Sequence, residues 1–217
     1  MQIILVSSKP NIASSNMRKL LIEEFGFELT KDKFDSNSIH IKKVGAYEFK
    51  LIQCNKEVLQ IGYVQDSFKP DLYIILSTHK SEAKMKSLSC HISGNWEKGI
   101  PPANPNALRN MFVKLKEMKA KYTVSENIPN NKLSEEYAVT LEVTHHEPYE
   151  LNAPSIWVEV GGTEDEWNDM VACKVVCEAV MSGEYNSSAN INNAFSTAVG
   201  FGGPHHAPNF MKDYVIN

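Results

Sequence analysis

Apolar and polar positions along this chain follow two periods, one typical of β-strands and one typical of α-helices. Short runs rich in Val, Ile and Leu recur from the N-terminus onward, and the nearly unbroken run at 71–76 (DLYIIL) is typical of a strand covered on both faces. We therefore expect a sheet with buried central strands. The predicted strands cover residues 2–6, 38–43, 47–53, 71–76, 87–92, 137–144 and 155–160.

Other segments place apolar residues three and four positions apart, which predicts amphipathic helices. Ser14 or Ser15 is the expected N-cap of the first helix, and Thr163 with Glu166 fits a capping box at the start of a later one. The predicted helices cover residues 14–25, a segment from Asn104 or Asn106 to about Lys121, about 164–181 and, more weakly, about 189–199.

Interleaved apolar strands and helices predict an α/β fold. We expect a single domain over residues 1–217, built as a three-layer sandwich around a mixed, largely parallel sheet. A net charge of −4, from 22 basic and 26 acidic side chains, argues against a protein that coats nucleic acid. The first residues do not form a signal peptide and no apolar run could span a bilayer, so we expect a cytoplasmic protein.

The four cysteines form no Cys-x-x-Cys pair, and Cys173 with Cys177 has the spacing of two buried residues on one helix. Neither a Gly-x-Ser-x-Gly elbow nor a nucleotide-binding glycine motif occurs in the chain. The sequence therefore disfavours a serine nucleophile and chemistry driven by a nucleotide.

Six of the seven histidines fall in four short motifs at predicted strand ends or in glycine- and proline-rich loops. Imidazole binds zinc as a neutral ligand and carries protons near neutral pH. Ligands of α/β folds bind at the carboxyl ends of strands, so parallel strands would bring these histidines to one edge of the sheet. The candidate metal ligands are His79, His91, His145, His146, His205 and His206. The simpler alternative is a set of surface histidines in turns.

Five motifs, in order between residues 77 and 208, resemble the archaeal and plant type of D-aminoacyl-tRNA deacylase. The family usually has glycine where this chain has Glu147, and it often has tyrosine at the position of His206. The motifs are Ser77-Thr-His79-Lys-Ser-Glu82, His91-Ile-Ser-Gly94-Asn95-Trp96, Thr144-His145-His146-Glu-Pro148, Val158-Glu159-Val-Gly-Gly162-Thr163-Glu-Asp-Glu166-Trp167 and Gly200-Phe-Gly-Gly203-Pro-His205-His206-Ala-Pro208.

The resemblance implies hydrolysis of the ester between a D-amino acid and the 3′ end of tRNA, with zinc as cofactor. It also implies a fold similar to phosphorylases and peptidyl-tRNA hydrolases. Zinc bound by three protein ligands would activate water and polarise the carbonyl. His79, His145 and His205 are the first candidates for catalysis, with Glu82 and Glu159 as their carboxylate partners.

An aminoacyl-tRNA substrate also needs docking groups. Lys114 and Lys116 are candidates for phosphate contacts, although lysine clusters are often only solvated faces. The terminal adenosine could meet Asn95 and Trp96, or the turn formed by Gly161, Gly162 and Thr163, whose position before a helix also suits an anion.

Two other functions fit the same residues: a zinc-dependent amidase or peptidyl-tRNA hydrolase, and a module that binds tRNA or metal without catalysis. We expect a monomer or a weak homodimer.

Overall fold

The computed structural model describes residues 1–217 except 81, 96, 125–131, 186–197 and 213–217. The strands are β1 (Gln2–Ser8), β2 (Glu28–Phe34), β3 (Asn37–Val44), β4 (Tyr47–Cys54), β5 (Leu72–His79), β6 (Ser87–His91), β7 (Ala138–Leu141) and β8 (Ser155–Gly161). The helices are α1 (Ile12–Glu23), α2 (Pro105–Val124), α3 (Glu164–Trp167) and α4 (Met170–Met181), with 3-10 segments η1 (Val58–Asp66) and η2 (Pro208–Phe210).

All eight strands form one sheet in the order β2-β3-β4-β1-β5-β8-β6-β7. The central strands β4, β1, β5 and β8 run parallel, and β6 pairs with β7 in parallel. However, β6 runs antiparallel to β8, and β2, β3 and β4 form an antiparallel meander. The predicted α/β fold with a mixed, largely parallel sheet is therefore confirmed.

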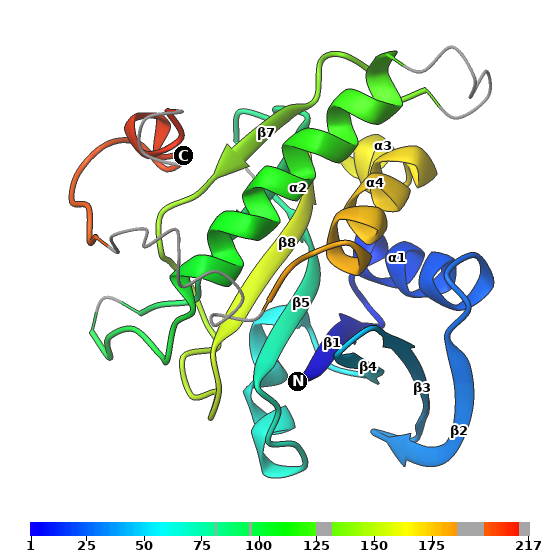
Figure 1. Ribbon diagram of the computed structural model, residues 1–217. Coiled ribbons are helices and arrows are strands. Elements are labelled where there is room, and N and C mark those ends of the chain that lie inside the picture. Colours follow the sequence, from blue (N-terminus) through cyan, green and yellow to red (C-terminus); the bar gives the residue numbers. More distant parts are fainter. Residues whose placement is uncertain (81, 96, 125–131, 186–197, 213–217) are drawn as a thin grey trace.

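The two faces of the sheet are covered differently. Helices α1, α2 and α4 pack on one face, against the alternate strand residues that include Ile74, Leu88 and Val158 (Figure 1). On the other face, Tyr73 and Trp157 belong to a second apolar cluster that is closed by η1. The layer on this second face is thus a 3-10 segment with loops, and it leaves part of the sheet free for a site.

Several element boundaries differ from the prediction. Helix α1 begins at Ile12, two residues before the predicted range, because the side chain of Asn11 accepts the hydrogen bond from the Ser14 N–H. The predicted helix over 164–181 is divided into α3 and α4, and Asp169 caps the second part. The capping box of Thr163 and Glu166 is confirmed. Strand β2 and segment η1 were not predicted, and most of the weaker helix over 189–199 lies outside the described residues.

The four cysteines are buried and free, which confirms the burial predicted for Cys173 and Cys177 from their helical spacing. In the part of the chain that the structure describes, no helix is long and apolar enough to cross a membrane.

Candidate active site

The site is built on the face of the sheet that the α-helices leave free. Because side chains alternate along a strand, Ser77 and His79 of β5 share this face with Glu159 of β8 and His91 of β6. Glu159 lies opposite Ser77 on one side and Ser89 on the other. A carboxylate therefore sits at the centre of the sheet, between strands that carry histidines.

The histidines do converge, but not along the route that the sequence suggested. Parallel strands were expected to deliver them to one edge, whereas β6 and β7 run opposite to β5. His79 consequently reaches the site from the carboxyl end of β5, and His91 reaches it from the reverse direction. They meet at Glu159 of β8, because His79 pairs with position 161 and His91 with position 157, each two positions from Glu159.

Backbone hydrogen bonds hold the remaining histidine loops against these strands. Gly94 N–H donates to the carbonyls of His145 (3.2 Å) and His146 (2.9 Å), which joins the loop after β6 to the loop after β7. Val143 N–H donates to the carbonyl of His205 (2.9 Å), which fixes the C-terminal loop beside β7. Three loops distant in sequence are thereby joined around one point.

Two buried glutamates lie among the imidazoles. His79 Nδ1 is 3.1 Å from Glu142 Oε1 and 3.4 Å from Glu159 Oε2. On its other side, Glu142 Oε2 is 3.1 Å from His205 Nε2 and 3.6 Å from His145 Nε2. The side chain of Glu142 is fully buried, so its charge can be compensated only by these neighbours.

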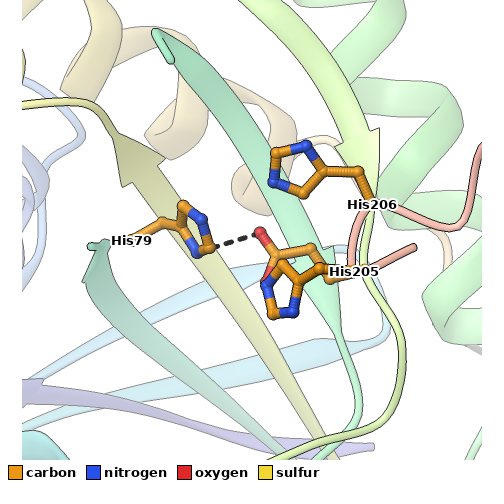
Figure 2. Close-up of side chains that lie close together, drawn as sticks. His79, His205 and His206 are labelled. Carbon is orange, nitrogen blue, oxygen red and sulfur yellow. Dashed lines mark hydrogen bonds and ion pairs between the residues drawn. The ribbon is translucent and has the colours of Figure 1, made fainter. Parts of the chain in front are cut away.

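The imidazole rings form one continuous cluster. The ring centroids of His91 and His145 are 4.2 Å apart, and those of His145 and His205 are 4.4 Å apart. His79 stacks on His205 at 5.4 Å and lies 5.5 Å from His206. Figure 2 shows His79, His205 and His206 turned toward one another. All six predicted histidines therefore belong to one site.

The protonation of this cluster is uneven. Burial by itself lowers the pKa of His79, but its hydrogen bonds to Glu142 and Glu159 outweigh burial and raise that pKa to about 10. Burial and the neighbouring His91 and His146 lower the pKa of His145 to about 4. Burial also lowers the pKa of His146. His79 is thus cationic at neutral pH, while His145 and His146 are neutral.

Three histidines share a feature that suits metal binding. A carbonyl oxygen can only accept, so each Nδ1 donates to a backbone carbonyl: His91 to Ile92 (3.1 Å), His145 to Val143 (2.7 Å) and His146 to Glu147 (2.9 Å). This bond leaves the lone pair of Nε2 available and fixes the ring, as is usual for metal-binding histidines.

The donor atoms around these rings fit a cation. The ligand atoms of His91, His145 and His146 all lie within 4.8 Å of one another, and a second group consists of His79, Glu142, His205 and His206. His91 Nε2 and His79 Nε2 are buried without a hydrogen-bond partner among the described residues. His146 also has a positive φ of 41°, a strained conformation typical of functional positions.

A cleft of about 1050 Å³ opens onto the cluster. The cleft is lined by His79, His145, His146, His205 and His206 together with Glu159, and also by Asn11 and residues 57–60 of η1 and its N-cap. A volume of this size is sufficient for a small ligand or the end of a larger one.

Three other predicted site residues do not belong to the histidine cluster as the structure describes it, and a fourth is not described. Glu82 is exposed and forms no hydrogen bond or ion pair with the histidines in the described part of the chain, whereas Glu142 contacts His79 directly. Lys114 and Lys116 lie on α2, which covers the opposite face of the sheet, and Lys114 pairs with Glu117 at 2.7 Å. Trp96 lies outside the described residues.

The remaining candidates have local structural partners. Asn95 caps its own turn and donates to Glu147 Oε1 at 3.3 Å. The Thr163 N–H and hydroxyl both donate to Glu166 Oε2, at 2.8 and 2.7 Å, so an internal carboxylate already occupies this turn. Gly161 packs tightly, since an ideal Cβ there would lie 2.1 Å from Ser87 Oγ. Gly162 has a φ of 140°.

Sequence reasoning overlooked Glu142 and Asn11. Glu142 stands between Leu141 and Val143 near the end of a predicted strand, as Glu159 stands between two valines in another. Glu142 and Glu159 thus share a recognisable pattern, a glutamate between apolar residues in a predicted strand, which could have identified Glu142 from the sequence.

Comparisons with known proteins agree with this geometry. The D-aminoacyl-tRNA deacylase family model matches residues 66–215. D-aminoacyl-tRNA deacylases of Pyrococcus abyssi and Methanocaldococcus jannaschii are each 30% identical to this chain, over 96% and 98% of it respectively and 74% of each relative.

Solved structures support the fold. A conserved protein of unknown function is similar with a TM-score of 0.72 and 24% identity, over 96% of this chain and 70% of that one. A uridine phosphorylase of Phytophthora capsici is similar with a TM-score of 0.51 and 11% identity, over 84% and 92%. The expected likeness to phosphorylase folds is thus confirmed. With the family model covering most of its length, the chain belongs to the D-aminoacyl-tRNA deacylase family.

Proposed function

We propose that this protein hydrolyses the ester bond of D-aminoacyl-tRNA and releases the free D-amino acid and tRNA. Family membership supports the reaction, and the single observation that carries it is the cluster of six histidines around two buried glutamates in an open cleft. Such a cluster supplies what ester hydrolysis requires, namely activated water, a stabilised oxyanion and a proton for the leaving ribose oxygen. A tRNA substrate also accords with the cytoplasmic location expected from the sequence.

We further propose zinc as the cofactor, held by Nε2 of His91, His145 and His146. These imidazoles have their Nδ1 atoms bound to backbone carbonyls, and the lowered pKa values of His145 and His146 favour the neutral form that binds metal. His79 is a poorer ligand in its cationic form, between two carboxylates. Bound zinc would lower the pKa of a water molecule to about 7 and polarise the ester carbonyl.

The other side chains of the site then have distinct roles. Glu159 and Glu142 orient His79, because they hold its Nδ1 from two sides. The cationic His79 faces the cleft and can stabilise negative charge that develops on the carbonyl oxygen. His205 and His206 lie at the mouth of the cleft and can pass a proton to the leaving oxygen.

A deacylation assay on paired D- and L-aminoacyl-tRNA, with and without a chelator, tests both proposals. We expect hydrolysis of the D-form alone, lost on chelation and restored by zinc. Full activity in metal-free protein would refute the zinc assignment and leave acid–base catalysis by the histidines. Hydrolysis of peptidyl-tRNA or a free amide in place of the ester would favour the alternative hydrolases, and tRNA binding without turnover would favour a binding module.

His146→Ala offers a direct test of the ligands. It should remove bound zinc from the purified protein, as measured by elemental analysis, whereas His206→Ala should keep the metal and lower only the rate. Equal zinc in both variants would contradict the proposed ligand set.

A further inference from the structure

Three lysines follow the carboxyl ends of three neighbouring parallel strands. Lys9 comes directly after β1, Lys56 comes two residues after β4, and Lys80 comes directly after β5. These strands are adjacent in the sheet, in the order β4-β1-β5, so their ends lie within about 10 Å of one another at the usual strand spacing. We call these three residues the lysine edge.

Hydrogen bonds fix the loops of the lysine edge relative to one another. Lys9 N–H donates to the carbonyl of Cys54 (2.9 Å), and the Ser8 hydroxyl donates to the carbonyl of Lys56 (2.8 Å). The side-chain amide of Asn11 donates to the Thr78 hydroxyl (3.0 Å), two residues before Lys80. The three positive charges are therefore carried by one rigid platform.

The charges of the lysine edge are available to a ligand. All three lysines are exposed, and none forms an ion pair within the part of the chain that the structure describes. The ammonium of Lys56 instead lies 4.7 Å from the centroid of the Tyr63 ring. The acidic neighbours are the exposed Glu57 and also Asp35, whose carboxylate accepts a hydrogen bond from the Asn55 N–H and interacts with the charge of Lys56. The edge thus carries three lysines against two carboxylates, in a chain whose net charge is −4.

The lysines of α2 differ from the lysine edge in their ion pairs and in their position on the sheet. Lys114 pairs with Glu117 at 2.7 Å and Lys121 pairs with Glu178 at 2.6 Å. Helix α2 also packs on the face of the sheet opposite the histidines. A ligand that reaches the histidine cluster would therefore not lie along this helix.

The cleft joins the lysine edge to the histidines, since Lys80, Asn11 and His79 all line it. We propose that the lysine edge binds the phosphates of the tRNA acceptor end while the 3′-terminal ribose lies at the histidine cluster. The inference rests on the proposed function, because the ester is on the last nucleotide and the phosphates lead away from it. Lysines that contact phosphates release counterions, so binding should depend steeply on salt.

The test compares three variants of the full-length protein. The edge variant is Lys9→Ala/Lys56→Ala/Lys80→Ala, and Lys114→Ala/Lys116→Ala represents the competing face. The control is Lys19→Ala/Lys31→Ala/Lys69→Ala, which removes three exposed charges from α1, the outer strand β2 and the amino end of β5. Affinity for uncharged tRNA is measured as a function of salt, deacylation of D-aminoacyl-tRNA gives kcat and KM, and thermal unfolding checks each fold.

We expect the edge variant to bind tRNA about 10- to 100-fold more weakly, with its salt slope reduced by about 2 since each lost contact to a single strand contributes about 0.7. Its kcat at saturating tRNA should match that of the unmodified protein, and the control should behave like the unmodified protein throughout. An edge variant that binds like the control overturns the proposal, as does a larger loss in the α2 variant. The unmodified protein could also bind tRNA, with a salt dependence that the edge variant reduces, and yet hydrolyse no D-aminoacyl-tRNA. In that case the proposed function is refuted, while the docking surface is supported.

Discussion

Replacing Gly161 with alanine tests how tightly the sheet holds His79. An ideal Cβ at position 161 would lie 2.1 Å from Ser87 Oγ and 3.2 Å from His79 Cδ2, both shorter than the 3.5–4.0 Å typical of carbon contacts. The Ser87 hydroxyl must move, and His79 must shift by a few tenths of an ångström. Overpacking of this kind costs about 1–3 kcal/mol, which corresponds to a melting temperature lower by about 2–12 °C for a chain of this size.

The same substitution should also slow catalysis. A shift of a few tenths of an ångström lengthens the 3.1 Å contact of His79 with Glu142, so we expect kcat for D-aminoacyl-tRNA to fall by about three- to tenfold, given that a misplacement of 1 Å can cost about 100-fold. The double variant Ser87→Ala/Gly161→Ala removes the atom at 2.1 Å and leaves the contact with His79. It should therefore recover stability but not full activity.

Ser87→Ala alone is the control, because its hydroxyl has no hydrogen-bond partner among the described residues and its removal should change stability little. Unfolding by urea and steady-state deacylation measure the two effects. An alanine at position 161 that leaves the melting temperature and kcat unchanged, while raising KM, would refute the packing argument. That outcome would instead favour the turn at Gly161 as a substrate contact.

Substitutions at three further residues separate the roles of individual polar groups. Glu142→Gln should lower the free energy of unfolding by about 3 kcal/mol and kcat by more than tenfold, since it breaks a buried ion pair; unchanged urea midpoints would contradict this. Asn11→Asp keeps the oxygen that caps α1 but loses the donor to Thr78, so this variant should be as stable as the unmodified protein yet less active. Asn11→Ala loses the cap as well and should also be less stable by about 1 kcal/mol. The hydrogen bond from Tyr63 lowers the pKa of Asp35, so its stabilisation is present above the ordinary value of 3.8 and is lost as the pH falls below it. Tyr63→Phe should accordingly flatten the fall in urea midpoint between pH 5 and pH 3, and an unaltered profile would exclude this contribution.

All strands except β2 could be predicted from the sequence, but the direction of each strand in the sheet could not. The run at 71–76 and the pattern SIWVEV at 155–160 identify β5 and β8 because burial determines which residues can occupy a strand. Their neighbours are determined by the tertiary fold. Strand β8 follows β6 and β7 in sequence yet lies between β5 and β6 in the sheet, and no local pattern records that insertion.

Site residues could likewise be predicted where residue type was informative, but not where only the tertiary fold brings residues together. Residue chemistry identified the six histidines, because imidazoles beside glycine and proline turns are suited to ligand binding. For the lysines, clustering in sequence pointed to Lys114 and Lys116, and this stays a prediction. The proximity of Lys9, Lys56 and Lys80 follows only from strand order, which no local pattern in the sequence records.

Glu142 shows how a buried face can reveal a site before its ligands are known. Polar residues occur at every second position of β6 (SLSCH), and Ser155 and Glu159 lie on the same face of β8, yet both strands are fully buried. In an exposed strand, such polar residues would simply face water. In a buried strand, each polar group needs a hydrogen-bond or charge partner inside the protein. Glu142 and Glu159 place two carboxylates there, and imidazole nitrogens of His79, His91 and His205 lie within 3.7 Å of them. Buried carboxylates need positive partners, and imidazoles can provide them by binding protons or by sharing a metal ion with the carboxylates, whatever the family.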